Sequence, residues 1–62
     1  MLMSPVETET IRLLLVEDHE VTRVGLRTLL QGFPQFEIVG ETGSVADSLA
    51  ALTRCQPDVV LL

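Results

Sequence analysis

An α/β fold built on a parallel sheet is predicted by the way apolar segments alternate along this 62-residue chain. Three short apolar runs, at residues 11–16, 36–41 and 59–62, have the length and composition of strands. Two longer segments between them, residues 20–31 and 44–55, carry apolar side chains at helical spacing. Strands that alternate with helices through short loops pair in parallel, which predicts a βαβαβ unit.

The first strand, at residues 11–16, is apolar apart from Arg12, a pattern typical of a strand buried on both faces. Glu17 and Asp18 follow it directly. If the second crossover passes the first strand, the strand order is 2-1-3, with one helix on each face of the sheet. Binding sites in open parallel sheets lie beyond the carboxyl ends of the strands, where the order reverses. Glu17 and Asp18 are expected at this point.

The first helix, residues 20–31, is expected to bury an apolar stripe made of Val21, Val24, Leu26, Leu29, Leu30 and Phe33. The opposite face is expected to carry Glu20, Arg23, Arg27 and Gln31. Asp18 is the expected N-cap, Gly32 the expected left-handed residue after the helix, and Pro34 prevents continuation. Gly25 costs up to about 1 kcal/mol relative to Ala inside a helix, so we expect it to pack closely on a neighbour.

The second strand, residues 36–41, has mixed polarity, which favours an edge position in the sheet. Phe36, Ile38 and Gly40 are expected to point one way, and Glu37 and Glu41 the other.

The second helix begins after Ser44, with Asp47 three residues later as in a capping box, and ends near Cys55 because Pro57 follows. Its buried stripe is expected to comprise Val45, Leu49 and Leu52, with Ala46, Ala50 and Ala51 beside it.

Composition excludes several classes of protein. The net charge is −5, with nine acidic residues and no lysine, so contact with nucleic acid is not expected. The lone Cys55 forms no internal disulfide, and no apolar run approaches the ~20 residues of a membrane span, which favours a cytoplasmic protein without membrane contact. Residues 1–10 show no periodicity and are expected to be a flexible tail, and nothing in the chain predicts an enzyme.

The residues of the turn after the first strand limit the kind of ligand that could bind there. It has no glycine through which backbone N–H groups could approach a phosphate, and two carboxylates would repel one. Carboxylates at a strand end suit Mg²⁺, which takes one or two of them and keeps several waters. Asp18 and Glu17 are therefore candidate metal ligands. The alternative is that both acids only stabilise the positive end of the following helix.

Four segments resemble the receiver domain of two-component response regulators: residues 11–19, 21–30, 39–43 and 56–62. Their order and spacing, and the Asp18-His19 pair and Val24-Gly25-Leu26-Arg27 in particular, are similar to the NarL/FixJ (LuxR-type) branch of transcription factors. The resemblance covers residues 11–62. It implies the N-terminal half of a flavodoxin-like (CheY-like) fold.

The resemblance also implies roles for residues. Asp18 corresponds to the direct Mg²⁺ ligand of the family and Glu17 to an acid that acts through water. The phosphoacceptor Asp is expected directly after Leu62, outside this sequence, so phosphorelay by a sensor histidine kinase belongs to the full-length parent. Asp58 precedes the third strand and is not the acceptor. His19 is not expected to be a ligand or phosphodonor.

Without the later strands, the third strand becomes an edge with apolar side chains at Val59, Val60, Leu61 and Leu62. Apolar edges recruit partners, so self-association as a homodimer or higher oligomer is expected, by two-fold antiparallel pairing of third strands or by exchange of elements. We expect no tightly bound Mg²⁺ from two carboxylates alone. The alternative function is that of a self-assembling half-domain without signalling activity.

Overall fold

The computed structural model describes residues 10–62 of the chain. Five elements follow one another: β1 (Ile11–Val16), α1 (Glu20–Leu30), β2 (Phe36–Thr42), α2 (Val45–Cys55) and β3 (Val59–Leu61). The prediction of a flexible tail at residues 1–10 falls, except for Thr10, outside the described residues.

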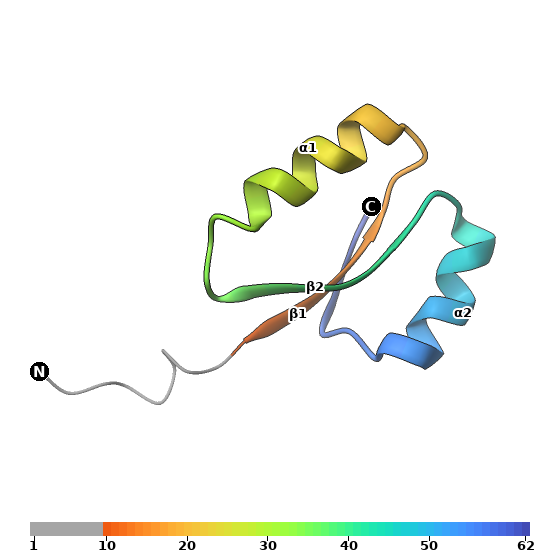
Figure 1. Cartoon of the computed structure of the whole chain (residues 1–62). Coiled ribbons are helices and arrows are strands. Elements are labelled where there is room, and N and C mark those ends of the chain that lie inside the picture. The colour runs from red at the N-terminus through yellow and green to blue at the C-terminus, as the bar shows by residue number, and fades with distance from the viewer. Residues whose placement is uncertain (1–9) are drawn as a thin grey trace, which may run out of the picture.

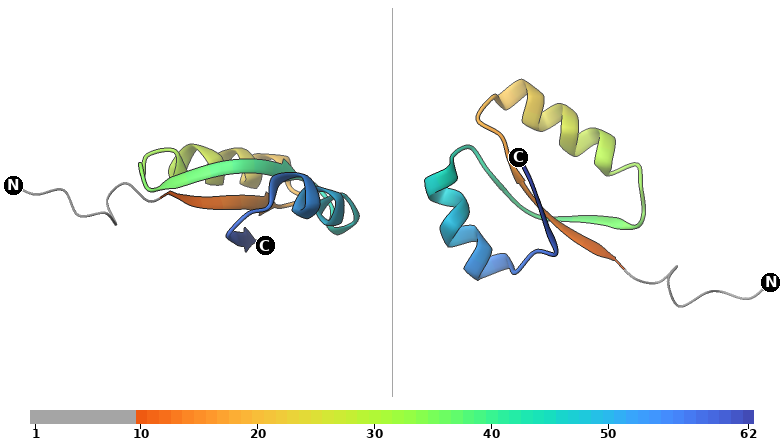
Figure 2. Two further views of the ribbon diagram at one scale, coloured as in Figure 1. Left: turned by 90° about the horizontal axis from the view of Figure 1, so that it is seen from below. Right: turned by 180° about the vertical axis from the view of Figure 1, so that it is seen from behind.

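The three strands form one parallel sheet in the order β2-β1-β3, which confirms the predicted α/β topology (Figure 1). β1 is the central strand because it pairs with both β2 and β3, and its last four residues, Leu13–Val16, are all buried. Leu14 and Val16 form a cluster with Ala51 of α2. Since side chains alternate along a strand, Leu13 and Leu15 point to the other face, where α1 crosses the sheet (Figure 2). The predicted arrangement of one helix on each face is confirmed.

A β-bulge interrupts β2 at Val39. Leu13 of β1 pairs with Ile38, but the next residue, Leu14, pairs with Gly40. One extra residue reverses the alternation of side chains beyond it. Gly40 therefore points to the α2 face with Leu14, and Glu41 points to the α1 face. The prediction that Gly40 shares a face with Ile38, and Glu41 with Glu37, is wrong because no sequence period reveals a bulge.

Small residues bring α2 onto the sheet. Ser48 and Ala51 are its buried residues, whereas Val45 and Leu49 are 67% and 63% exposed. A Cβ atom on Gly40 would lie 3.0 Å from the Cys55 Sγ atom, so the helix approaches the strand at its closest where neither side is bulky. The predicted stripe of large side chains is thus wrong for α2.

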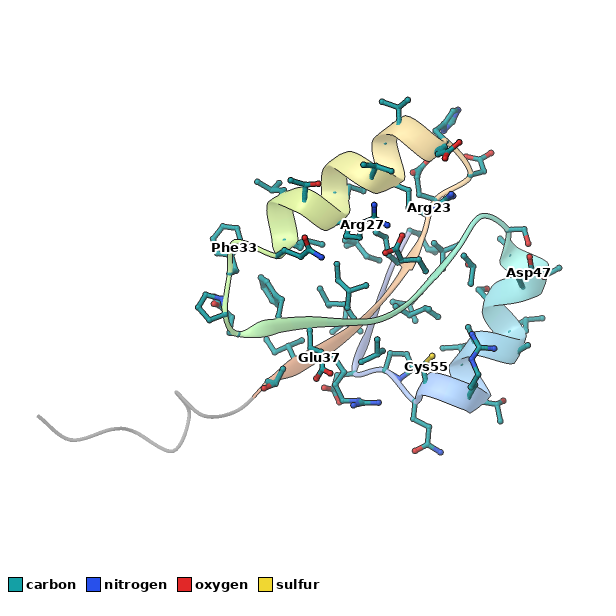
Figure 3. The ribbon with its side chains drawn as sticks, viewed as in Figure 1. Arg23, Arg27, Phe33, Glu37, Asp47 and Cys55 are labelled. Carbon is teal, nitrogen blue, oxygen red and sulfur yellow. The ribbon has the colours of Figure 1, made fainter. Side chains whose placement is uncertain are left out.

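The face of α1 toward the sheet is only partly the predicted one: Leu26 and Leu30 are half-buried, but so are Arg23 and Arg27, which were expected on the opposite face. Val21 and Leu29 are 86% and 61% exposed, while Arg23 and Arg27 are half-buried. Both arginines point from α1 toward β2, where Glu41 supplies the opposite charge (Figure 3). The ion pairs of both arginines with Glu41 thus lie on the same side of α1 as the half-buried Leu26 and Leu30.

The helices depart from prediction at three positions: the N-cap of α1, Gly32 after its end, and Gly25 inside it. The N-cap of α1 is His19, without a side-chain cap, rather than Asp18. Gly32 has no left-handed backbone; that conformation occurs instead at Gln56, with φ of 50°. A Cβ atom on Gly25 would meet nothing within 4 Å, so close packing does not explain this glycine. Ser44 caps α2 as predicted and accepts a hydrogen bond from the Asp47 N–H.

Candidate functional site

The turn between β1 and α1 carries the two predicted metal ligands. Glu17 continues the pairing of β1 by one residue, because its N–H donates to the Thr42 carbonyl at 3.0 Å. Its side chain is largely covered, with 20% exposed, whereas the Asp18 side chain is exposed. The carboxylates therefore stand at the carboxyl end of the central strand, as expected from the sequence.

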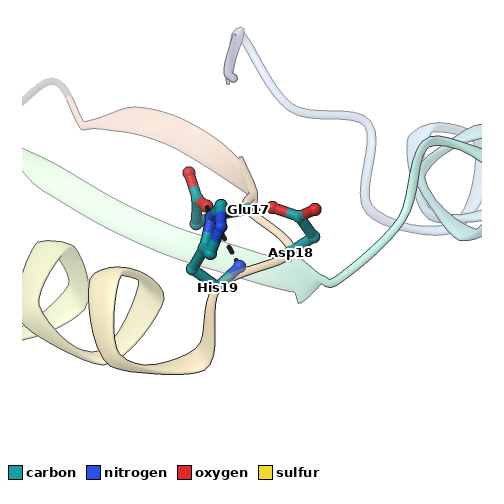
Figure 4. A group of neighbouring side chains, drawn as sticks. All are labelled: Glu17, Asp18 and His19. Atoms are coloured by element: carbon teal, nitrogen blue, oxygen red, sulfur yellow. Dashed lines mark hydrogen bonds and ion pairs between the residues drawn. The ribbon is translucent and has the colours of Figure 1, made fainter.

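His19 lies beside both carboxylates (Figure 4). Its Nδ1 atom is 2.7 Å from Glu17 Oε2 and 3.0 Å from Asp18 Oδ1, and its backbone N–H donates to Glu17 Oε2. The imidazole is thus within hydrogen-bonding distance of both carboxylates. Sequence analysis gave His19 no role and did not anticipate this contact.

These contacts shift the pKa values of Glu17 and His19. The hydrogen bond from the His19 side chain, followed by that from its backbone N–H, lowers the pKa of Glu17 below its ordinary value. The hydrogen bond to Glu17, followed by the charges of Asp18 and Glu17, raises the pKa of His19. Each group thus favours the charged form of the other.

A pocket lies at this edge of the sheet, where three segments meet. The turn after β1 contributes Glu17 and Asp18, and the residue after β3 contributes Leu62. The lining is completed by Val16, Gly43, Ser44 and Val45. The third strand therefore ends beside the acidic pair, as the predicted strand order requires.

The donor atoms suit a small hard cation. Glu17, Asp18 and His19 each offer one ligand atom, and these atoms lie within 4.8 Å of one another. Mg²⁺ favours carboxylate oxygens and retains water in its other positions, so the two carboxylates fit it better than the imidazole does. The assignment of Glu17 and Asp18 as metal ligands remains a prediction.

Asp58 lies at the other edge of the sheet. Its N–H donates to the Arg12 carbonyl at 2.8 Å, and its Oδ2 atom accepts from the Arg12 N–H at 2.9 Å. This exchange joins the start of β3 to the start of β1, far along the strands from Glu17. Asp58 thus fastens the start of β3 to β1.

Cys55, the last residue of α2, contacts β2. Its thiol donates to the carbonyl of Val39, the bulged residue, at 3.2 Å. The predicted self-association residues lie on the edge strand: Val59 and Val60 are 44% and 38% exposed, and Leu62 is 86% exposed.

Arg23 is the residue near the site that sequence reasoning missed. Its Nη1 atom donates to the Glu17 carbonyl at 2.6 Å. The sequence shows that Arg23 and Arg27 share one face of the helix, but it does not show that this face is turned toward the sheet. Only the bulge in β2, which turns Glu41 toward α1, reveals their partner.

Neither helix in residues 10–62 is long and apolar enough to cross a membrane. No family model matches the chain, and no solved structure matches it.

Curated relatives do match. The chain is 46% identical over 52 residues to the DNA-binding transcriptional activator DevR/DosR of Mycobacterium tuberculosis, covering 84% of this chain and 24% of that protein. It is 36% identical over 52 residues to the transcriptional regulatory protein LiaR of Bacillus subtilis, covering 84% of this chain and 25% of LiaR. It is 36% identical over 53 residues to the response regulator protein VraR of Staphylococcus aureus, covering 86% of this chain and 25% of VraR. The chain spans about a quarter of the length of these relatives.

Proposed function

We propose, because the homologues of this chain are response regulators of the NarL/LuxR family, that residues 11–62 form the first half of a receiver domain. The full-length protein would be a cytoplasmic transcription regulator that a sensor histidine kinase phosphorylates. Residues 11–62 would have no enzymatic activity of their own. One observation supports the proposal above all others. The two adjacent carboxylates stand at the end of the central strand, at the edge where the strand order reverses.

In this proposal Asp18 binds Mg²⁺ directly and Glu17 acts through a water. The half-buried Glu17, fixed by the Thr42 carbonyl and by His19, provides an oriented acceptor, and the exposed Asp18 remains free to meet the ion. When bound, Mg²⁺ neutralises charge on a phosphoryl group. Two carboxylates leave most of the octahedral shell to water, so binding to this chain should be weak.

The acceptor of the phosphoryl group is not among the described acidic residues in this proposal. Asp58 is held by Arg12 at the opposite edge, and Asp18 serves the metal. Incubation with a small acyl phosphate and Mg²⁺ should therefore leave the intact mass of the 62-residue chain unchanged. An aspartyl phosphate on Asp18 or Asp58 would contradict this assignment.

The metal site is tested by a Mg²⁺ titration followed through amide chemical shifts. We expect saturable shifts at residues 16–19 in the wild type and their loss in Asp18→Asn. Glu37→Gln is the matched control, because it removes the same charge from an exposed position at the far end of β2. Equal titrations in wild type and Asp18→Asn would refute the assignment.

Exposed apolar side chains support a second property, self-association of this chain. β3 is an edge strand with one side unpaired within residues 10–62, and Val59, Val60 and Leu62 are exposed on or beside it. Antiparallel pairing of two β3 strands about a two-fold axis would extend the sheet and cover these residues. As an alternative to signalling, such a dimer would be a self-assembling half-domain.

A further inference from the structure

The guanidinium group of Arg23 lies where three segments of the chain come together. Its Nη1 atom donates to the carbonyl of Glu17 at 2.6 Å, in the acidic turn. Its Nε atom is 3.8 Å from Glu41 Oε1 on β2. A Cβ atom on Gly43, in the turn between β2 and α2, would come within 3.2 Å of Nη1. Only 23% of the Arg23 side chain is exposed, so these contacts are largely shielded from water.

Glu41 is itself held in place. The Nη1 atom of Arg27 lies 3.2 Å from Glu41 Oε1 and 3.1 Å from Oε2, one turn of α1 beyond Arg23. The bulge at Val39 is what turns Glu41 to this face of the sheet. Glu41 is thus bonded mainly to Arg27, and its contact with Arg23 is the longer one, at 3.8 Å. The 2.6 Å hydrogen bond to the Glu17 carbonyl is the shortest contact of the Arg23 guanidinium and does not pass through Arg27.

We propose that Arg23 is a positioning residue for the acidic turn, and that a side chain at residue 43 would press on its guanidinium. The hydrogen bond to the Glu17 carbonyl fixes the backbone at the point from which both carboxylates project. Gly43 has no positive φ, so space rather than backbone conformation explains it. This inference rests on the proposed function insofar as the acidic turn binds Mg²⁺.

Arg27 provides the matched control. It sits on the same helix and bonds to the same carboxylate, but its hydrogen bonds go to Glu41 and not to the acidic turn. If the arginines only fasten α1 to β2, Arg23→Gln and Arg27→Gln should have the same consequences. If Arg23 positions the turn, only Arg23→Gln should alter metal binding strongly.

The test compares Mg²⁺ affinities, from amide-shift titrations, with thermal unfolding of the same proteins. Residues that orient metal ligands typically contribute 10- to 100-fold to affinity, so Arg23→Gln should weaken binding about tenfold while Arg27→Gln stays near wild type. Gly43→Ala should weaken binding in the same direction as Arg23→Gln, although it retains the arginine. Equal loss of stability in both arginine variants with unchanged affinity in all three would overturn the proposal.

A second readout needs no metal. The His19 N–H is bonded to Glu17 Oε2 at 3.0 Å, and its hydrogen exchange reports how well the turn is ordered. Exchange should accelerate in Arg23→Gln and Gly43→Ala but not in Arg27→Gln. If the wild type binds no Mg²⁺, the proposed function fails, and this exchange still decides the role of Arg23. Should Arg23→Gln fail to fold, Gly43→Ala decides it by both readouts.

Discussion

At the scale of single residues, Gly40 and Gly25 are expected to respond in opposite ways to the same substitution. A Cβ atom at Gly40 would lie 3.0 Å from both Cys55 Sγ and Leu14 Cδ1, in the packed interface of β2 with α2. Overpacking of this kind costs about 1–3 kcal/mol, so Gly40→Ala should lower the free energy of unfolding. Urea denaturation measures the change.

Gly25→Ala is the control for that substitution. A Cβ atom at Gly25 meets nothing within 4 Å, and Ala is favoured over Gly inside a helix by about 0.5–1 kcal/mol. The free energy of unfolding should therefore rise by about that amount. A loss of stability in Gly25→Ala, or none in Gly40→Ala, would contradict the packing described for these two positions.

His19 and Glu17 predict a pH dependence at the acidic turn. The raised pKa of His19 means that its contribution to stability is complete below its unfolded pKa and is lost as pH rises through the folded value. The lowered pKa of Glu17 means that its contribution is present above its unfolded pKa and is lost as pH falls through the folded value. The pair should be fully charged between the two folded pKa values.

The ring resonances of His19, followed by NMR over pH, measure this directly. We expect a pKa above 6.5 in the wild type and a lower one in Glu17→Gln, because the carboxylate is the main cause of the shift. Glu37→Gln should leave the titration unchanged. A wild-type value at or below 6.5 would show that the imidazole does not bind the carboxylates in solution.

At the scale of elements, the two helices begin differently. Ser44 Oγ accepts a hydrogen bond from the Asp47 N–H at 3.1 Å, whereas α1 has no side-chain cap. Ser44→Ala should therefore destabilise the chain by about 1 kcal/mol, and Ser44→Thr, which keeps the hydroxyl, should retain most of the stability. Equal stability of the two variants in urea would show that the cap does not contribute.

The order of elements and the strand topology could be predicted from the sequence, because each strand and helix has its own local pattern. The acidic pair could also be placed, since it follows the central strand directly. The helix faces could not. Spacing shows which side chains share a face of α1, but whether Arg23 and Arg27 turn inward depends on Glu41, whose direction is set by the bulge at Val39.

The buried face of α2 could not be predicted for the same reason. Its large apolar side chains predicted the buried face, yet Ser48 and Ala51 are its buried residues, with Ala51 clustered against Leu14 and Val16 of β1. Close approach of small residues is a property of two elements together. It leaves Val45 and Leu49 exposed, and no pattern within α2 alone distinguishes the two outcomes.

At the scale of the whole molecule, apolar residues remain exposed on separate surfaces, and the proposed self-association assigns them different roles. Val60, in the middle of β3, is 38% exposed, and Val21, on α1, is 86% exposed. If β3 strands pair, Val60→Lys should reduce the molar mass in solution, whereas Val21→Lys should leave it at the wild-type value.

Size-exclusion chromatography with light scattering over a range of concentrations measures both variants. The wild type should form a dimer or a defined oligomer. The reverse pattern, with dissociation by Val21→Lys alone, would place the interface on α1. A wild type that stays monomeric at every concentration would contradict self-association itself.

The proposed function requires that the acidic pair form a divalent-cation site at the edge where the strand order reverses. Paramagnetic broadening of amide signals by Mn²⁺, which also suits carboxylate ligands, maps the position of the ion along the chain. An ion bound at the acidic pair should cause the strongest broadening at Glu17 and Asp18, clear broadening at Gly43 and Leu62, and little at Asp58, at the far edge of the sheet. Broadening centred on Asp58, or spread evenly over the acidic residues, would contradict it.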